Sequence, residues 1–237
     1  MNIDVTLIPA LKDNYIFLLR LPQEQYVVVD PAVANGVVDA LRDNDLAAIL
    51  LTHHHHDHID GVAELVQKYG YPVYGNGADS QLPPNTLPLA EGNIVPNLNA
   101  TFTVMETPGH TAHHISYYSA ENDMLFCGDV LFGGGCGRLF DGTAAQMFES
   151  LQRIKQLPPE TKVYCAHEYT ESNVLFGSTV KPENTAINQR LEDVRKLRRQ
   201  GVSTVPLTLA EELATNIFLQ AETLEDFTAL RKAKDVF

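Results

Sequence analysis

The stretch "LTHHHHDHIDG", residues 51–61, decides the fold and holds five of the nine histidines of this 237-residue chain. It overlaps the end of "LAAILLT" (46–52), an apolar run that predicts a buried strand. It also overlaps "DHIDGVAELVQKYG" (57–70), where apolar residues recur at a helical period and Gly70 is a typical helix stop. The histidines are therefore expected between the end of a strand and the start of a helix.

The other four histidines lie at 110–114 and at 167, and each place again follows a predicted strand. These strands are "ATFTVMETPGH" (100–110) and "TKVYCAH" (161–167). In α/β proteins, site residues collect at the carboxyl ends of strands. We therefore expect the three clusters to converge on one point, whereas an expression tag would sit at a terminus.

The spacing within the first cluster predicts metal ligands. Along an extended chain alternate side chains share a face, so His53 and His55 can reach one ion together. Asp57 and His58 are adjacent and are expected to point apart, which suits either a second ion or a site straddled by two ions. Imidazole and carboxylate ligands together suit Zn(II), with Mn(II) and Fe(II) as alternatives.

The remaining pattern predicts two domains, 1–167 and 168–237. In the first, "IDVTLIP" (3–9), "NYIFLLR" (14–20), "QYVVVD" (25–30), "HHISYYS" (113–119) and "DMLFCGDV" (123–130) favour strands, and "ANGVVDALRDND" (34–45) and "TAAQMFESLQRIKQL" (143–157) favour helices. After His167 the strand signals stop. Helices are expected within 182–201, 207–216 and 224–235.

The composition and net charge exclude some classes of function. Apolar residues make up 44% and charged residues 20%, which is typical of a globular protein. The net charge of −13 is uneven, with −11 up to His167 and −2 beyond it, and it argues against a nucleic-acid partner.

No apolar run approaches a membrane span and no signal peptide is evident, so we expect a cytoplasmic protein with no membrane partner. The three cysteines (Cys127, Cys136, Cys165) are expected to be reduced and buried, and the expected oligomeric state is a monomer.

Four motifs carry a resemblance to a known superfamily. "THHHHDH" (52–58), "TPGHT" (107–111), "CGDVLF" (127–132) and "AHEYT" (166–170) resemble the metallo-β-lactamase superfamily, an α+β fold built as an αββα sandwich with a two-metal site. The resemblance implies one metal held by His53, His55 and His110, a second held by Asp57, His58 and His167, and Asp129 bridging the two.

Three further stretches resemble one family within this superfamily. "FGGGCGRLFDGT" (132–143), "VYCAHEYTESN" (163–173) and "LRKAKDVF" (230–237) are similar to glyoxalase II, the hydroxyacylglutathione hydrolases, and the match spans essentially the whole chain. It implies hydrolysis of S-D-lactoylglutathione and other S-2-hydroxyacylglutathiones to glutathione and D-lactate or another 2-hydroxy acid. This reaction is the second step of methylglyoxal detoxification. Attack by a metal-bridging hydroxide is implied, with Asp57 as the catalytic residue that orients the hydroxide and takes its proton.

The same resemblance implies the substrate contacts. Residues at the positions of Arg138, Tyr169, Arg231 and Lys234 contact the glutathione moiety, and the helical tail becomes a glutathione-binding domain. Arg231 and Lys234 lie three apart, so on a helix they share a face. Many relatives carry a tyrosine at the position of Phe140, and the phenylalanine cannot donate the hydrogen bond of that hydroxyl.

For other residues near the predicted site, the sequence predicts less specific roles. Asp30 is expected to orient the metal-binding loop, and His54 and His56 to point away from it. His114 is expected to hydrogen-bond to backbone or to a ligand, and His113 has no assignment. Gly133 to Gly135 lack the lysine and Ser/Thr of a phosphate loop, which favours close backbone approach to a bound substrate.

Two other classes of function remain open. One is a different enzyme of the superfamily, such as a persulfide dioxygenase with a single Fe(II) or a lactonase; a nuclease is disfavoured by the charge. The other is a metal-binding module without catalysis. Metal content and oxygen consumption distinguish the dioxygenase from a dinuclear hydrolase.

Overall fold

The computed structural model describes residues 3–42 and 44–237, which form two compact units. Unit 1 comprises Met1–Glu106 and His113–Gly128, and unit 2 comprises Thr107–Ala112 and Asp129–Phe237. Across the described residues, none of the helices combines the length and the apolar character needed to span a bilayer.

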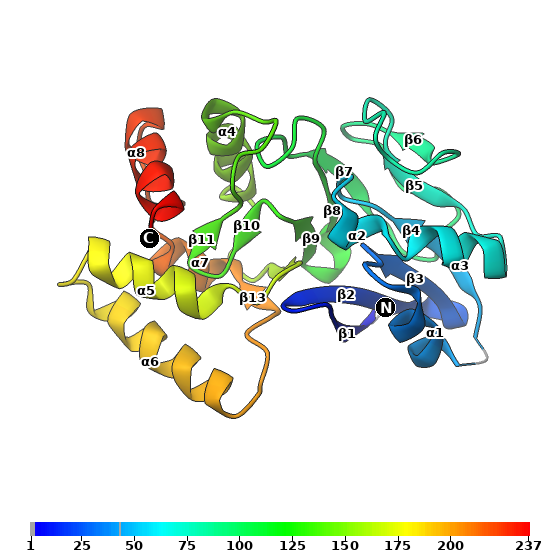
Figure 1. Ribbon diagram of the computed structural model, residues 1–237, viewed down its shortest axis with the longest axis horizontal. Helices are drawn as coiled ribbons and strands as arrows, with labels where there is room; N and C mark the ends of the chain where they lie inside the picture. Colours follow the sequence, from blue (N-terminus) through cyan, green and yellow to red (C-terminus); the bar gives the residue numbers. More distant parts are fainter. Residues whose placement is uncertain (1–2, 43) are drawn as a thin grey trace. The chain divides into compact units, whose positions relative to one another are not determined.

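A six-stranded mixed sheet forms the larger part of unit 1 (Figure 1). Its strands lie in sequence order: β1 (Asp4–Ala10), β2 (Asn14–Leu21), β3 (Gln25–Val29), β4 (Leu46–Leu50), β5 (Val73–Asn76) and β6 (Leu87–Leu89). The first three strands pair antiparallel, and β3 to β6 pair parallel. Only β5 and β6 were not expected from the sequence. The short 3₁₀ turn η1 (Pro22–Glu24) joins β2 to β3.

Helices α1 (Ala34–Leu41) and α3 (Val62–Tyr69) cover one face of this sheet. Val37 and Leu41 of α1 and Leu65 of α3 are fully buried in one apolar cluster with residues of β1 to β5. The helix predicted over 34–45 ends at Leu41 because Arg42 takes a left-handed φ of 55°, and position 43 of that prediction lies outside the described residues.

The helix predicted over 57–70 is broken into α2 (His56–Ile59) and α3. The break lies at Gly61, whose N–H donates to the carbonyl of Pro31 at 2.9 Å. A Cβ atom at Gly61 would lie 2.5 Å from that oxygen, so the close approach requires glycine. A tertiary contact therefore ends a pattern that is locally continuous.

A second group of antiparallel strands completes unit 1: β7 (Thr103–Glu106), β8 (Ile115–Ser119) and β9 (Met124–Gly128), with the 3₁₀ turn η2 (Ala120–Asn122) before β9. Phe126 of β9 meets Phe17 of β2 with ring centroids 5.6 Å apart. The Tyr117 hydroxyl donates to the carbonyl of Leu51 at 2.8 Å. These contacts pack the second group of strands onto the first sheet.

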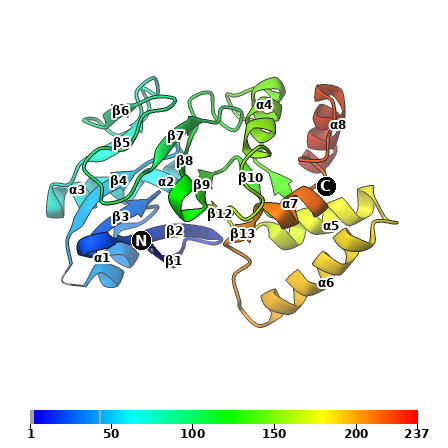
Figure 2. The same ribbon diagram turned by 180° about the vertical axis from the view of Figure 1, so that it is seen from behind.

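Unit 2 is mainly helical, and Figure 2 shows its helices from behind. It contains the hairpin β10 (Leu131–Phe132) and β11 (Gly135–Cys136), then α4 (Ala144–Ile154), β12 (Lys162–Cys165), α5 (Thr170–Val180), α6 (Thr185–Arg199), β13 (Leu207–Thr208), α7 (Leu209–Thr215) and α8 (Leu224–Asp235). Helix α4 starts with a capping box between Thr143 and Gln146.

The tail differs from the prediction in two elements. The two-residue strand β13 pairs antiparallel with β12, although the sequence after His167 predicted helices alone. Helix α5 was not predicted, because three of the residues on its buried face, Thr170, Asn173 and Gly177, are not apolar and give no helical period of apolar residues. The helices α6, α7 and α8 lie within their predicted ranges.

Candidate functional site

The loop between β4 and α2 in unit 1 brings two histidines together as predicted. Nε2 of His53 lies 3.0 Å from Nδ1 of His55, so both nitrogens can face one ion. His53 is buried, and its other nitrogen, Nδ1, lies 3.0 Å from the Thr52 hydroxyl. The alternation of an extended chain thus produces the expected pair.

Asp30 orients this loop, which confirms its predicted role. Its Oδ1 accepts from the Thr52 N–H at 2.8 Å, and its Oδ2 accepts from the Thr52 hydroxyl at 2.6 Å. Nδ1 of His58 lies 3.0 Å from the same Oδ2. Because a carboxylate only accepts, Nδ1 of His58 carries the proton, and Nε2 presents its lone pair as a ligand atom.

Asp57 and His58 do not point apart, which corrects the prediction. They lie in α2, and Oδ2 of Asp57 is 3.8 Å from Nε2 of His58. Asn14, at the start of β2, donates from Nδ2 to Oδ2 of Asp57 at 3.0 Å and to its backbone carbonyl at 3.1 Å. Sequence reasoning missed Asn14; its only signal is a polar residue that opens an otherwise apolar strand.

The other histidines of unit 1 differ in their surroundings, and His114 packs against a candidate ligand. His56 is 92% exposed beside Asp60, and Nδ1 of His54 lies 2.8 Å from Oδ2 of the buried Asp79. His113 is exposed, and its carbonyl accepts from Asn76. His114 is fully buried and stacks on His53, with ring centroids 4.9 Å apart. The expectation that His54 and His56 point away is confirmed.

Unit 2 contributes the second set of candidate ligands, His110, Asp129 and His167, all of them buried. Oδ2 of Asp129 lies 3.4 Å from Nε2 of His110, and Oδ1 lies 3.4 Å from Nε2 of His167. Each imidazole therefore faces a different oxygen of one carboxylate. This is the arrangement expected of a carboxylate that bridges two ions.

The tautomer of His110 supports a cation at this position. Nδ1 of His110 lies 2.8 Å from the carbonyl of Arg138, an acceptor, so Nδ1 carries the proton in the neutral ring. The lone pair of Nε2 then faces an anionic oxygen. Two acceptors at that distance repel each other unless a proton or a metal ion lies between them, and the nitrogen and oxygen atoms of this set are ones that divalent metals bind.

The predicted substrate contacts all lie in unit 2. Arg138 is 63% exposed and Phe140 is 64% exposed, with the Phe140 ring 5.1 Å from that of His110. Tyr169 stacks on His167 at 4.7 Å with an interplanar angle of 4°. Each of the two candidate ligand histidines of this unit therefore contacts an aromatic ring.

Three cations lie near the end of the chain, and two of them, Arg138 and Arg231, contact the Asp235 carboxylate. Arg231 is buried, and it donates to the Asp235 carboxylate at 2.9 Å and to the carbonyl of Cys136 at 2.8 Å. Arg138 donates to the carbonyl of Asp235 at 3.1 Å. Lys234 donates to Ser172 at 3.0 Å. Burial and the charges of Arg231 and Arg138 lower the pKa of Lys234, so positive charge is in excess here.

The Gly133–Gly135 stretch has a different purpose from the one predicted. A Cβ atom at Gly133 would lie 2.3 Å from the Thr170 hydroxyl, one at Gly134 would lie 2.6 Å from Val174, and one at Gly135 would lie 2.4 Å from Asn173. All three meet helix α5. The glycines are thus required because this helix packs directly on the β10–β11 turn, a reason internal to the fold and not the approach of a substrate.

The cysteines match the expectation. Cys127, Cys136 and Cys165 are free thiols, and all three are buried. Burial raises the pKa of Cys136 to about 11 despite the nearby Arg231 charge, so the thiol is protonated at neutral pH and is a poor nucleophile.

Comparison with known proteins matches both parts of the chain. The model of the metallo-beta-lactamase superfamily matches residues 11–167, and the model of the hydroxyacylglutathione hydrolase C-terminus matches residues 168–237. A hydroxyacylglutathione hydrolase of Pectobacterium carotovorum subsp. carotovorum (strain PC1) is 47% identical over 221 residues, covering 92% of this chain and 87% of that protein.

Solved structures show the same fold. The crystal structure of ETHE1 from Myxococcus xanthus has a TM-score of 0.73 at 26% identity, covering 98% of this chain and 90% of that one. TTHA1623, solved in a di-iron-bound form, has a TM-score of 0.61 at 30% identity, covering 69% of this chain and 91% of that one.

Proposed function

Because this chain belongs to the hydroxyacylglutathione hydrolase family of the metallo-β-lactamase superfamily, we propose that it hydrolyses the thioester of S-D-lactoylglutathione and of other S-2-hydroxyacylglutathiones. The products are glutathione and the free 2-hydroxy acid. The observation that carries the proposal is the family match over residues 168–237, which distinguishes this chain from superfamily members that lack such a tail.

The metal centre is part of the same proposal. By the family resemblance, His53, His55 and His110 would hold one divalent ion, Asp57, His58 and His167 would hold the other, and Asp129 would serve as a ligand to both. The support is the family membership, together with the geometry inside each unit: paired nitrogens at His53 and His55, and one carboxylate between two imidazoles at Asp129. Zn(II) suits these nitrogen and oxygen ligands best, with iron or manganese as the alternatives.

The chain's own residues have distinct parts in the reaction. Divalent ions supply a water acidic enough to act near neutral pH and polarise the carbonyl. Asp57, fixed by Asn14, accepts the proton released as the carbonyl is attacked. Asp30 and the Arg138 carbonyl hold the imidazoles of His58 and His110 in the ligating tautomer. The thiolate leaving group is stable without a strong general acid.

Glutathione recognition is assigned to the cationic cluster of unit 2. Glutathione carries two carboxylates, and the chain is acidic overall at −13, so the substrate needs local positive charge. Arg138, Arg231 and Lys234 supply three cations against the single carboxylate of Asp235. Tyr169 and Phe140 add apolar contact. Phe140 lacks a hydroxyl, so that contact has no hydrogen bond to the peptide. The cytoplasmic location and the monomeric state stay predictions.

The test is steady-state hydrolysis of S-D-lactoylglutathione, with metal analysis and oxygen consumption measured on the same sample. We expect thioester hydrolysis, up to two metals per chain and no oxygen uptake. Oxygen uptake with one iron per chain would instead indicate a dioxygenase.

A matched pair on α8 tests recognition of glutathione. Lys234→Ala removes charge-assisted hydrogen bonding, which at roughly 1.5–3 kcal/mol corresponds to a rise in KM of about 10- to 150-fold. The loss falls on KM because the glutathione end does not change during the reaction. Lys232→Ala, an exposed cation on the same helix, is the control. An equal loss on a small non-glutathione thioester would show that Lys234 does not recognise glutathione.

A further inference from the structure

The turn between β10 and β11 has no side chains that could hold it, because residues 133–135 are all glycine. On one side it packs against α5. On the other side, two buried residues of the α7 region bind its backbone. Glu212 Oε2 accepts from the Gly134 N–H at 2.9 Å, and Asn216 Nδ2 donates to the carbonyls of Phe132 at 3.2 Å and Gly135 at 3.0 Å.

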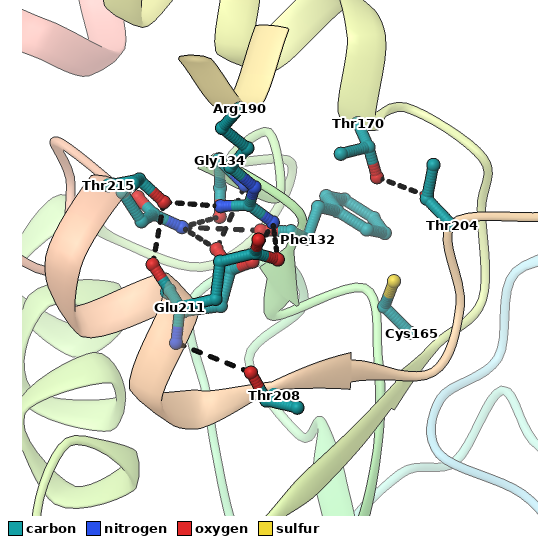
Figure 3. Close-up of polar contacts among 12 residues, drawn as sticks. Phe132, Gly134, Cys165, Thr170, Arg190, Thr204, Thr208, Glu211 and Thr215 are labelled. Carbon is teal, nitrogen blue, oxygen red and sulfur yellow. Dashed lines mark hydrogen bonds and ion pairs between the residues drawn. The ribbon is translucent and has the colours of Figure 1, made fainter. Parts of the chain in front are cut away.

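The Glu212 carboxylate is itself held from α6. Arg190 forms an ion pair with Glu212 and donates from Nη1 to the Thr215 hydroxyl at 2.7 Å (Figure 3). Glu212 is fully buried and Arg190 is 4% exposed. Burial alone would lower the pKa of Arg190, but the Glu212 carboxylate raises it above its ordinary value, so the guanidinium stays charged. A charged network thus extends from α6 through α7 to the glycine turn.

The far end of the same hairpin meets the cationic cluster. Cys136, the last residue of β11, accepts from Arg231 through its carbonyl. Two residues later, Arg138 binds Asp235, which is also the partner of Arg231. The position of the hairpin therefore sets the positions of both arginines.

We propose that Arg190, Glu212 and Asn216 are positioning residues for glutathione recognition, which hold the β10–β11 hairpin so that Arg138 and Arg231 keep their places. The proposal rests on the proposed function, because it names glutathione as the ligand. None of the three residues needs to touch the substrate.

The polar character of the network is the reason to assign it a role beyond stability. A buried ion pair is often no more stabilising than well-packed apolar residues of similar volume. Apolar residues cannot, however, bind the Gly134 N–H or the carbonyls of Phe132 and Gly135. The network supplies directional bonds to a turn that offers only its backbone.

The test replaces the pair by apolar residues. In the double variant Arg190→Met/Glu212→Leu, we expect KM for S-D-lactoylglutathione to rise at least tenfold. We expect kcat, metal content and kcat/KM for a small non-glutathione thioester to stay within about threefold of wild type. The amide of Gly134 should exchange its hydrogen at least a hundredfold faster. Thr215→Val is the matched control, because Thr215 is buried in the same network without touching the hairpin, and its KM should stay at the wild-type value.

One smaller change keeps the test decisive if the double variant does not fold. Asn216→Ala leaves the ion pair intact but removes two bonds to the hairpin, and it should raise KM for the glutathione substrate alone.

A wild-type KM in both the double variant and Asn216→Ala would overturn the proposal, as would equal losses on both thioesters. A wild-type protein that hydrolyses no glutathione thioester would refute the proposed function. The proposed role in positioning for glutathione would then be refuted as well. Hydrogen exchange of the Gly134 amide would still show whether the network holds the hairpin.

Discussion

Replacing Asn14 by alanine should weaken the metal-binding loop of unit 1 without unfolding the protein. Asn14 is 5% exposed and makes two hydrogen bonds, to the carboxylate and to the carbonyl of Asp57. A bond to a charged group contributes about 1.5–3 kcal/mol and a neutral one about 1 kcal/mol. The variant should therefore lose about 2.5–4 kcal/mol of unfolding free energy. Tm falls by about 2–4 °C per kcal/mol in a chain of this size.

Asn14→Ala should lower kcat or metal affinity more than a variant that loses the same unfolding free energy at another site. Residues that orient metal ligands typically cost 10- to 100-fold in metal affinity or activity when they are replaced. We expect a fall of about that size in kcat, or in the affinity for added Zn(II), because the Asp57 carboxylate can then rotate. Asn14→Asp should be worse still, since it places a second carboxylate where Nδ2 now lies 3.0 Å from Oδ2 of Asp57.

Asn76→Ala provides the matched control. Asn76 is 7% exposed in the same unit and also makes two hydrogen bonds, to the His113 carbonyl and the Ala78 N–H, but it does not contact Asp57. Thermal unfolding, titration with Zn(II) and kcat are measured for both variants. If Asn14→Ala matches Asn76→Ala in metal affinity and kcat, Asn14 contributes only stability, and the reasoning is refuted.

Three further predictions follow from the candidate site. Asp129→Ala should lower metal content and activity together, because its two oxygens face different histidines; elemental analysis that finds two ions in the variant would contradict this. Asp57→Asn should keep the fold and lower kcat strongly, and a variant with both metals and near-normal kcat would leave Asp57 without a catalytic role. The pKa of Lys234 is lowered from 10.5 by burial and by the charges of Arg231 and Arg138, so its cation is lost as pH rises through a value below 10.5. KM for the glutathione substrate should therefore rise in alkaline solution before ordinary lysines titrate, and a Lys234→Ala variant should lack that rise.

Local pattern was enough to predict the strands that precede the ligands and the pairing of His53 with His55. It failed where the decisive contact comes from a distant residue. The helix expected over 57–70 breaks because Gly61 meets Pro31, and Asp57 turns toward His58 because the chain is already helical there. The domain boundary between 167 and 168, and the convergence of all three histidine clusters on one point, stay predictions.

The glycine run, residues 133–135, is a second case in which the sequence does not identify a distant contact. Its sequence predicts that something approaches the backbone closely, but the sequence does not identify what approaches. In the structure, α5 fills the space on one side, and Glu212 and Asn216 bind the turn on the other. Glu212 and Asn216 lie roughly eighty residues further along the chain, at positions with no motif of their own.

The candidate ligands of unit 1 depend on residues that are not themselves ligands. In unit 1, Thr52 binds Asp30 through its N–H and its hydroxyl, and its carbonyl accepts from Ile115 at 2.9 Å. Gly128 approaches so closely that a Cβ atom there would lie 2.4 Å from the Thr52 hydroxyl, and its φ of 46° is one that glycine adopts without strain. Side chains at the end of β4 are therefore fixed by contacts from two other strands. A motif can supply the ligand atoms, but their direction depends on such supports, so substitutions at Asp30, Thr52 or Gly128 should affect metal affinity although none of these residues belongs to the proposed ligand set.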